Sequence, residues 1–254
     1  MIHKRIALIT GATSGIGEAT ARLLATHPFN LILCGRREDR LAVLKKELSN
    51  LTKVTTLSFD VRDKGAVKKS LALLEEEWKK IDILINNAGN AHGLDPIQSG
   101  SEEDWDAMID INVKGLLYVS REILPGMVER KSGHIINLGS IAAKEAYANG
   151  NVYCASKFAV DALSQGMRID LNAYGIKVSA IHPGLVETEF SIVRFKGDEA
   201  RAGNVYRGME PLKGEDIADL ILFILTRPAH VVVADLIVLP TAQASATIVK
   251  RDPV

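Results

Sequence analysis

The chain alternates between short runs that are apolar at nearly every position and longer stretches in which apolar residues recur every three or four positions. The runs occupy residues 5–10, 30–34, 54–59, 81–86, 133–138, 176–181 and 231–239. Such runs are typical of strands buried on both faces, whereas Leu41, Leu44 and Leu48 share one face of a helix. The alternation predicts an α/β fold in which right-handed crossovers build a doubly wound parallel sheet with helices on both faces.

One stretch departs from this pattern. Residues 184–214 lack strand character and contain Gly197, Gly203, Gly208 and Pro211. A long irregular segment inside a compact domain is usually a lid or a binding loop. Because no linker rich in Pro, Gly or Ser divides the chain, we expect a single domain over residues 1–254 with a mobile substrate-loop insertion at about 184–214.

Composition excludes several classes of protein. The charges balance, with 31 Lys and Arg against 31 Asp and Glu, which argues against a nucleic-acid-binding protein because such proteins carry a basic excess. Two cysteines cannot form a disulfide framework, and six histidines show no metal-binding spacing. No apolar run approaches the roughly 18 residues of a membrane span. We therefore expect a soluble, cytoplasmic protein without a metal ion, a nucleic-acid partner or a membrane anchor.

A glycine-rich segment, TGATSGIG, follows the first strand at residues 10–17 and leads into the helical stretch 18–25. Gly11, Gly15 and Gly17 would allow a tight turn and a close approach to a pyrophosphate, which the free N–H groups of a helix N-terminus would bind. This spacing also arises by chance, so the alternative is a helix-start turn without a ligand. The position between a strand and a helix favours a dinucleotide site.

The second strand ends in Gly35-Arg36-Arg37. An NAD-binding fold places an acidic residue near this point for the ribose 2′-hydroxyl, whereas a guanidinium can bind a 2′-phosphate through two hydrogen bonds. The two arginines therefore predict NADP as the cofactor. The alternative for one of them, Arg37 in particular, is that it only begins a surface helix.

The ends of the next two strands carry further candidates. Asp60 ends the third strand, where its carboxylate could accept a hydrogen bond from the adenine amino group. The segment NNAG ends the fourth strand at residues 86–89, and its small residues would let a cofactor lie against the backbone. Asn87 could instead, or in addition, bond neighbouring strand ends.

Three polar residues in the second half of the chain point to acid–base chemistry. Ser140 follows the fifth strand, and Tyr153 and Lys157 are four residues apart, so they share one face of a helix. A lysine cation favours phenolate and would lower the tyrosine pKa, which is about 10 in free peptides. The tyrosine could then exchange a proton with a carbonyl or alcohol oxygen that Ser140 holds by a hydrogen bond.

Together these segments resemble the short-chain dehydrogenase/reductase superfamily, in the family's order and over nearly the whole chain. The matches are TGATSGIG, NNAG, Asn112 within residues 110–113, Ser140, YCASK at residues 153–157 and Pro183-Gly184. The resemblance implies a single Rossmann-like dinucleotide-binding and catalytic domain with a seven-stranded parallel sheet. It also implies a tetrad in which the tyrosine is the acid/base, the serine positions the substrate oxygen, the lysine bonds the nicotinamide ribose, and the asparagine holds a water. The implied tetrad is Asn112, Ser140, Tyr153 and Lys157.

The same resemblance implies the residues that contact the cofactor. They lie in the glycine-rich segment, at the ends of the second, third and fourth strands, on the catalytic helix and after the sixth strand. These residues are Gly11, Thr13, Ser14, Gly15, Ile16, Gly17, Arg36, Arg37, Asp60, Val61, Asn87, Ala88, Gly89, Tyr153, Lys157, Pro183, Gly184, Val186 and Thr188.

A narrower resemblance, to NADP-dependent 3-hydroxy acid dehydrogenases such as serine and L-allo-threonine dehydrogenases, lies in the insertion and the tail. The matches are GLVETEFS (184–191), VRFKGD (193–198), RPAHV (227–231) and LPTAQ (239–243). It implies a homotetramer that interconverts a small 3-hydroxy acid, of the serine, allo-threonine or 3-hydroxypropionate type, and its oxo acid or semialdehyde. The substrate would contact Ser140, Tyr153 and a carboxylate-binding cation, for which we expect Arg194; Lys196 and a merely solvated loop cation are the alternatives.

Two other functions remain open at this point. A 3-ketoacyl carrier-protein reductase, or another carbonyl reductase, would use the same chemistry on a different substrate and would need a basic docking patch. A regulator that senses NADPH without catalysis is of another class, but it has no need for Tyr153 and Lys157 together.

Overall fold

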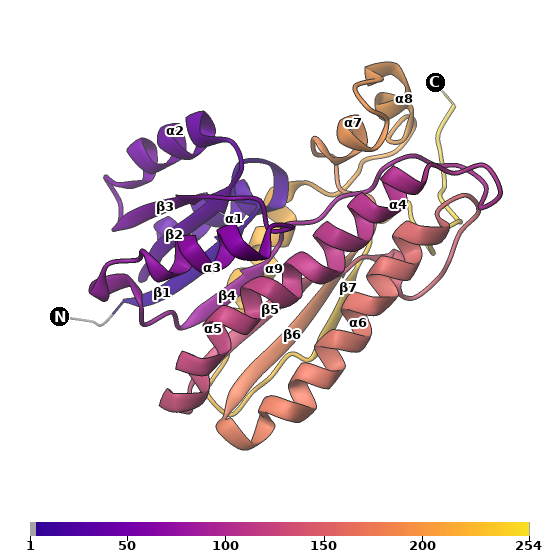
Figure 1. The fold of residues 1–254 in the computed structure, drawn as a ribbon. Helices are drawn as coiled ribbons and strands as arrows, with labels where there is room; N and C mark the ends of the chain where they lie inside the picture. Colours follow the sequence, from indigo (N-terminus) through magenta and orange to yellow (C-terminus); the bar gives the residue numbers. More distant parts are fainter. Residues whose placement is uncertain (1–3, 254) are drawn as a thin grey trace.

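The computed structural model describes residues 4–253 and contains one seven-stranded sheet (Figure 1). The strands are β1 (Arg5–Thr10), β2 (Phe29–Gly35), β3 (Val54–Ser58), β4 (Ile83–Asn86), β5 (Gly133–Leu138), β6 (Ile176–Pro183) and β7 (Asp235–Val238). Their order is β3-β2-β1-β4-β5-β6-β7, and every neighbouring pair is parallel. The predicted doubly wound parallel sheet is confirmed.

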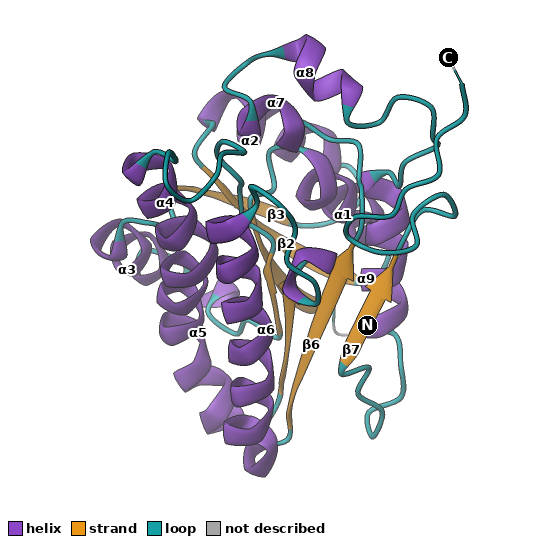
Figure 2. Ribbon diagram, turned by 90° about the vertical axis from the view of Figure 1, so that its right-hand side faces the viewer, coloured by secondary structure: helices purple, strands orange, loops and turns teal. Residues whose placement is uncertain are grey.

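Successive side chains of each strand point to opposite faces of the sheet, and a separate hydrophobic core lies on each face. In β1, Ala7 and Ile9 pack into a cluster with α1 (Gly15–Ala25), α2 (Glu38–Leu48) and α9 (Gly214–Leu225). Ile6 and Leu8 point the other way, into a cluster with α3 (Lys64–Ala72), α5 (Leu116–Arg130) and α6 (Asn151–Leu171). Figure 2 shows the two helical layers on either side of the strands. Apolar residues at successive strand positions therefore serve both cores.

The strand order reverses between β1 and β4, which pair in parallel with Ala7 opposite Ile83 and Ile9 opposite Ile85. The chain winds outward from β1 to β3, crosses to β4, and then winds outward to β7. In sheets of this kind ligands bind beyond the carboxyl ends of the strands, at the point where the order reverses. The glycine-rich segment and the NNAG segment lie at these strand ends.

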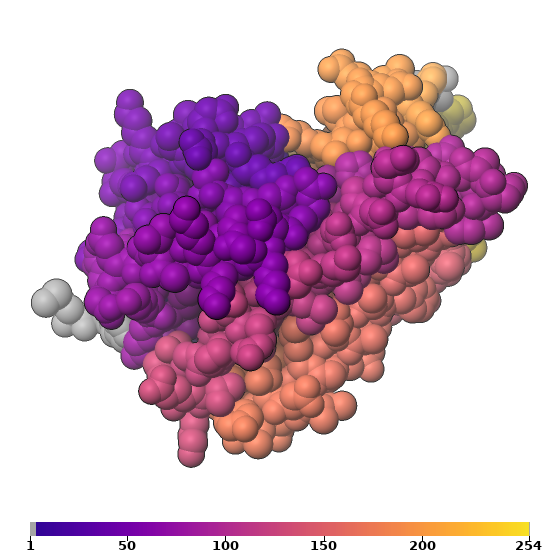
Figure 3. Space-filling view, viewed as in Figure 1, coloured from indigo at the N-terminus to yellow at the C-terminus, as the bar shows by residue number. Residues whose placement is uncertain are grey.

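The predicted insertion contains two short helices, α7 (Phe190–Arg194) and α8 (Glu199–Asn204), and only an isolated bridge between Val186 and Leu212. Figure 3 shows it as a lobe that projects beside the amino-terminal half, with a hollow between the two. Beside the insertion, α4 (Glu102–Ile109) continues through a π-helical turn at Asp110–Gly115 into α5. None of the helices within residues 4–253 is long and apolar enough to cross a bilayer.

Candidate active site

A cavity of about 500 Å³ opens at the carboxyl ends of the strands. It is bounded by the glycine-rich segment, the ends of β2 to β6, the beginning of α6 and the insertion. Every residue predicted to bind the cofactor or the substrate lines it, except Gly17. Of the predicted tetrad, Ser140, Tyr153 and Lys157 line the cavity and Asn112 lies behind its wall. Residues from widely separated parts of the sequence thus surround one space.

Gly17 has a packing role. A β-carbon at this position would overlap the carbonyl oxygen of Gly11, so the first turn of α1 can approach the loop only because residue 17 is glycine. The Asn87 side chain fixes the same loop, because its Nδ2 donates to the carbonyl oxygens of Thr10 (2.9 Å) and Gly11 (3.1 Å). The alternative proposed for Asn87, a bond between neighbouring strand ends, is therefore present.

The two arginines after β2 differ in their surroundings. The Arg37 guanidinium folds back onto the glycine-rich segment, where it donates to Thr13 and Ser14. The Arg36 side chain is 56% exposed, and its nearest acidic partner is Asp60 at 3.7 Å. Arg36 therefore keeps N–H groups available in the cavity, whereas those of Arg37 are largely engaged.

Asp60 is less available to an adenine than the sequence suggests. Both of its carboxylate oxygens accept hydrogen bonds from the Arg62 guanidinium, at 2.7–3.1 Å. Burial by itself would raise the pKa of Asp60, but the hydrogen bonds and charge of Arg62 outweigh it, so the net pKa lies below the usual value. Arg62, two residues farther along a loop, belongs to no motif, and sequence reasoning missed it.

Tyr153 and Lys157 lie on the same face of α6, as their spacing predicts, and both are buried. Lys157 Nζ donates to the carbonyl oxygen of Leu138 at 2.9 Å and lies 5.9 Å from the centre of the Tyr153 ring. Burial lowers the pKa of Lys157 to about 8. The ammonium group is therefore easily deprotonated for a lysine.

The expectation that Lys157 lowers the pKa of Tyr153 is wrong for the protein alone. Burial raises the pKa of Tyr153 well above its usual value, and the groups that act against this shift are the Ser140 hydroxyl and the Arg194 charge. The physical reason is that the phenol lies in a desolvated wall of the cavity, where a negative charge is disfavoured. The phenol is therefore protonated at neutral pH.

Ser140 is held from two sides. Its hydroxyl accepts a hydrogen bond from the Ala142 amide (3.1 Å), and its carbonyl oxygen lies 3.2 Å from Nδ1 of the fully buried His182. Nε2 of that imidazole lies 2.7 Å from the Asp235 carboxylate, which also accepts from Lys144 (2.7 Å). The structure thus places this buried, hydrogen-bonded histidine directly behind the serine.

Asn112 lies in the π-helical turn and is 2% exposed. Its Oδ1 accepts from the Asn90 amide (2.7 Å), and its Nδ2 donates to the Asn90 carbonyl oxygen (2.8 Å) and to the Ser156 hydroxyl (2.9 Å). The side chain thus fixes the loop after β4 against α6, and the predicted water-holding role stays a prediction. π-Helical turns of this kind frequently accompany functional sites.

Arg194 reaches into the cavity from α7. Its guanidinium carbon lies 5.6 Å from the centre of the Tyr153 ring, its Nη1 donates to the Tyr147 hydroxyl (3.0 Å), and its Nε donates to the Gly93 carbonyl oxygen (3.1 Å). The alternative cation, Lys196, instead pairs with Asp104 of α4 at 2.9 Å. Of the two candidates, only Arg194 lines the cavity.

These residues occur in a known arrangement. The family model described as short chain dehydrogenase matches residues 5–198, about three quarters of the chain. The chain belongs to the short-chain dehydrogenase family. This membership makes it an oxidoreductase, as the glycine-rich segment and the Tyr153–Lys157 pair predict.

Individual family members share more of the chain. It is 47% identical over 242 residues to a Salmonella typhi protein named "NADP-dependent 3-hydroxy acid dehydrogenase YdfG", covering 95% of this chain and 97% of that one. It is 46% identical over 249 residues to "Sulfoacetaldehyde reductase 2" of Chromohalobacter salexigens, covering 97% and 99%. A solved structure, "The Closed form of serine dehydrogenase complexed with NADP+", superposes with a TM-score of 0.91 at 45% identity, covering 98% of this chain and 100% of that one.

Proposed function

We propose that this short-chain dehydrogenase interconverts a small 3-hydroxy acid and its oxo acid or semialdehyde with NADP(H). The carrying observation is the position of Arg194, 5.6 Å from the ring of the candidate acid/base Tyr153 in the same cavity. A substrate with an anionic group close to its reacting hydroxyl matches this pair, because the guanidinium can bind a carboxylate while Tyr153 and Ser140 hold the oxygen. Serine, allo-threonine and 3-hydroxypropionate have that form.

The cavity has the groups that NADP(H) requires. Within the described residues the Ser14 side chain, at the N-cap of α1, makes no capping hydrogen bond, so the N–H groups of this helix end can bind a pyrophosphate. Arg36 offers a guanidinium for the 2′-phosphate, and Lys157 offers an ammonium for ribose hydroxyls. When bound, the nicotinamide supplies or accepts the hydride.

The protein's own residues handle the proton and the substrate's orientation. Because its pKa is raised by burial, Tyr153 keeps the proton that it would donate to a carbonyl oxygen during reduction. Ser140, fixed by Ala142 and His182, holds that oxygen in place. Arg194 fixes the other end of the substrate, so the reacting carbon is presented in one orientation.

A second candidate substrate class is the small sulfonates. The sulfoacetaldehyde reductase relative is 46% identical over nearly the whole chain, and a guanidinium can bind a sulfonate as well as a carboxylate. The ketoacyl alternative is less well supported, because it would place an uncharged acyl chain against Arg194. The intact Ser140, Tyr153 and Lys157 favour an enzyme over an NADPH-sensing regulator. Homotetramer assembly and a cytoplasmic location stay predictions.

Absorbance at 340 nm with NADP+ and a panel of serine, allo-threonine, 3-hydroxypropionate, isethionate and a neutral 3-hydroxy ester would separate these functions. We expect the highest kcat/KM with a 3-hydroxy acid. A preference for isethionate would favour the sulfonate function, and a preference for the ester would contradict both. No turnover of any compound, together with NADPH binding, would favour a regulator.

A further inference from the structure

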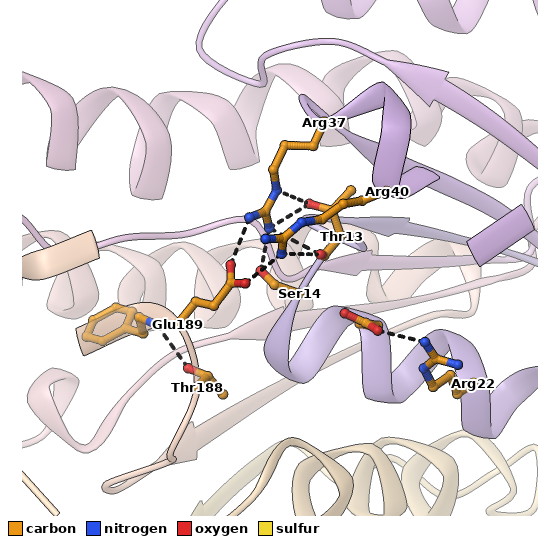
Figure 4. Close-up of polar contacts among 9 residues, drawn as sticks. Thr13, Ser14, Arg22, Arg37, Arg40, Thr188 and Glu189 are labelled. Carbon is orange, nitrogen blue, oxygen red and sulfur yellow. Dashed lines mark hydrogen bonds and ion pairs between the residues drawn. The ribbon is translucent and has the colours of Figure 1, made fainter. Parts of the chain in front are cut away.

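The carboxylate of Glu189, at the N-terminus of α7, joins the insertion to the beginning of α2 at one wall of the cavity. It accepts hydrogen bonds from Arg37 Nη1 (2.8 Å, to Oε2) and from Arg40 Nη1 (2.6 Å, to Oε1). Figure 4 shows the two guanidinium groups converging on this carboxylate. Both oxygens are thus engaged, each by a different arginine.

Arg37 also connects this ion pair to the glycine-rich segment. Its Nη2 donates to the Ser14 hydroxyl (2.8 Å) and to the Thr13 carbonyl oxygen (3.1 Å), while its Nη1 holds Glu189. One guanidinium therefore joins the candidate pyrophosphate-binding loop to the insertion. These contacts close one wall of the cavity, because Thr13, Ser14, Arg37 and Glu189 all line it.

The residues on either side of Glu189 contact the two functional ends of the cavity. Thr188 packs against the glycine-rich segment so closely that a β-carbon on Gly15 would lie 3.0 Å from the Thr188 Cβ. Phe190 packs edge-on against the Tyr153 ring, with centroids 5.7 Å apart. Three consecutive residues thus contact the loop, the arginines and the acid/base candidate. Four residues after Phe190, the same helix places Arg194 beside Tyr153.

The charges permit Glu189 and a cofactor phosphate to be bound together. Glu189 occupies Arg37 and Arg40, whereas Arg36 keeps its exposed guanidinium, 3.7 Å from an Asp60 that Arg62 already holds. A 2′-phosphate could bind Arg36 without displacing the Glu189 carboxylate. This arrangement indicates that the Glu189 carboxylate holds the insertion in place and does not compete with the 2′-phosphate for the same arginine.

We propose that Glu189 is a positioning residue that holds the insertion against the cofactor-binding half through its ion pairs with Arg37 and Arg40. Retention of the cofactor then depends on these ion pairs, and so does the placement of Phe190 and Arg194 against Tyr153. The inference rests on the proposed function, because it takes NADP(H) as the ligand of this cavity. It assigns Arg37 and Arg40 to closure of the cavity and leaves Arg36 to the 2′-phosphate.

The test compares Glu189→Gln with Glu187→Gln, which removes the same charge two residues away. Glu187 is exposed, and its carboxylate makes no ion pair within the described part of the chain. Stopped-flow fluorescence would measure the dissociation rate of NADPH from each purified protein, a readout that needs no turnover. We expect Glu189→Gln to raise the rate about 3- to 10-fold, since exposed ion pairs are individually weak, and Glu187→Gln to stay within about twofold of wild type.

Two further measurements exclude a general disturbance of the fold. Arg40→Gln should raise the NADPH dissociation rate by no more than Glu189→Gln does. The double variant should match Glu189→Gln, because that change already removes the Arg40 contact together with the Arg37 contact. High salt should raise the wild-type rate by a larger factor than that of Glu189→Gln, because ions screen the cofactor phosphates in both proteins but the Glu189 ion pairs only in wild type.

Three results would overturn the proposal: an unchanged dissociation rate in Glu189→Gln, a slower one, or additive effects in the double variant. A slower rate would mean that the carboxylate competes with the cofactor phosphate. Failure of the proposed substrate class would leave the NADPH dissociation rates interpretable, because that measurement needs no turnover. Failure of the proposed cofactor gives a different result, because wild-type protein would then not bind NADPH at all. In that case hydrogen exchange at the backbone amides of residues 188–194 still tests the fastening role: Glu189→Gln should speed exchange there, and unchanged exchange would overturn it.

Discussion

At the scale of single residues, Tyr153 combines burial with a protonated phenol at the cavity wall. Tyr153→Phe removes the proton donor and little else, so we expect NADPH binding to persist while kcat falls at least ~10²–10³-fold. Steady-state kinetics together with an NADPH binding isotherm would check this. A variant that keeps a tenth or more of wild-type kcat would exclude Tyr153 as the acid/base.

Substitutions of the neighbouring residues Arg36 and Arg37 should have different effects on cofactor preference. Arg36→Ala should remove most of an NADP preference of about 1–3 kcal/mol, the range of a charge-assisted contact, because its guanidinium is exposed and 3.7 Å from its acidic partner Asp60 rather than hydrogen-bonded to it. Arg37→Ala should weaken NADP and NAD alike, since Arg37 supports the glycine-rich segment. The ratio of kcat/KM values for the two cofactors in each variant decides the matter. The opposite assignment of effects would show that Arg37 contacts the phosphate.

The lowered pKa of Lys157 predicts that NADPH binding depends on pH. Its pKa of about 8 leaves roughly half of the protein with a neutral amine at pH 8, and an anionic dinucleotide favours the charged form. Binding of NADPH should therefore take up about half a proton per site at pH 8 and almost none at pH 6, and affinity should fall as the pH rises through 8. Calorimetry in buffers of different ionisation heats measures the uptake. Equal uptake in Lys157→Met would assign the proton to another group.

At the scale of elements, the first turn of α1 can close on the glycine-rich segment only without a side chain at residue 17. Gly17→Ala should lower the free energy of unfolding by about 1–3 kcal/mol, the usual cost of overpacking, and weaken NADPH binding. Gly166→Ala in α6 is the matched control, because no atom of residues 4–253 lies within 4 Å of the added carbon. It should stabilise the protein by about 0.5–1 kcal/mol. Denaturant melts would check both; equal behaviour of the two variants would contradict the packing argument.

At the scale of the whole molecule, the seven apolar runs all contain strands, because strands covered on both faces are apolar at most positions. The two edge strands, β3 and β7, are only partly covered. The ends were less predictable: β4 begins at Ile83, and β7 covers only Asp235–Val238. Apolar residues just outside them still pack against the core from loops; Ile81, for example, is 5% exposed. An apolar run therefore marks a strand together with its flanking segments, and at the sheet edge it includes exposed residues such as Ile237, which is 49% exposed.

The candidate site, too, could be predicted from the sequence only in part. Parallel strands bring their carboxyl ends to one edge, so residues that follow strands, such as Ser140 and Arg36, could be placed in one cavity from the sequence. Contacts between distant segments could not. Glu189 meets Arg37 across 152 positions, and no local pattern encodes that pairing. The direction of the Tyr153 pKa shift depends on burial, which spacing on a helix does not reveal.

The central claim is that Arg194 binds the carboxylate of a small 3-hydroxy acid beside Tyr153, and one comparison tests it most directly. The measurement is kcat/KM of wild type and Arg194→Ala on 3-hydroxypropionate and on its methyl ester. Loss of a charge-assisted contact predicts a fall of roughly 10–200-fold for the acid and a much smaller change for the ester. A parallel fall for acid and ester would make Arg194 a structural residue of the insertion and contradict the claim.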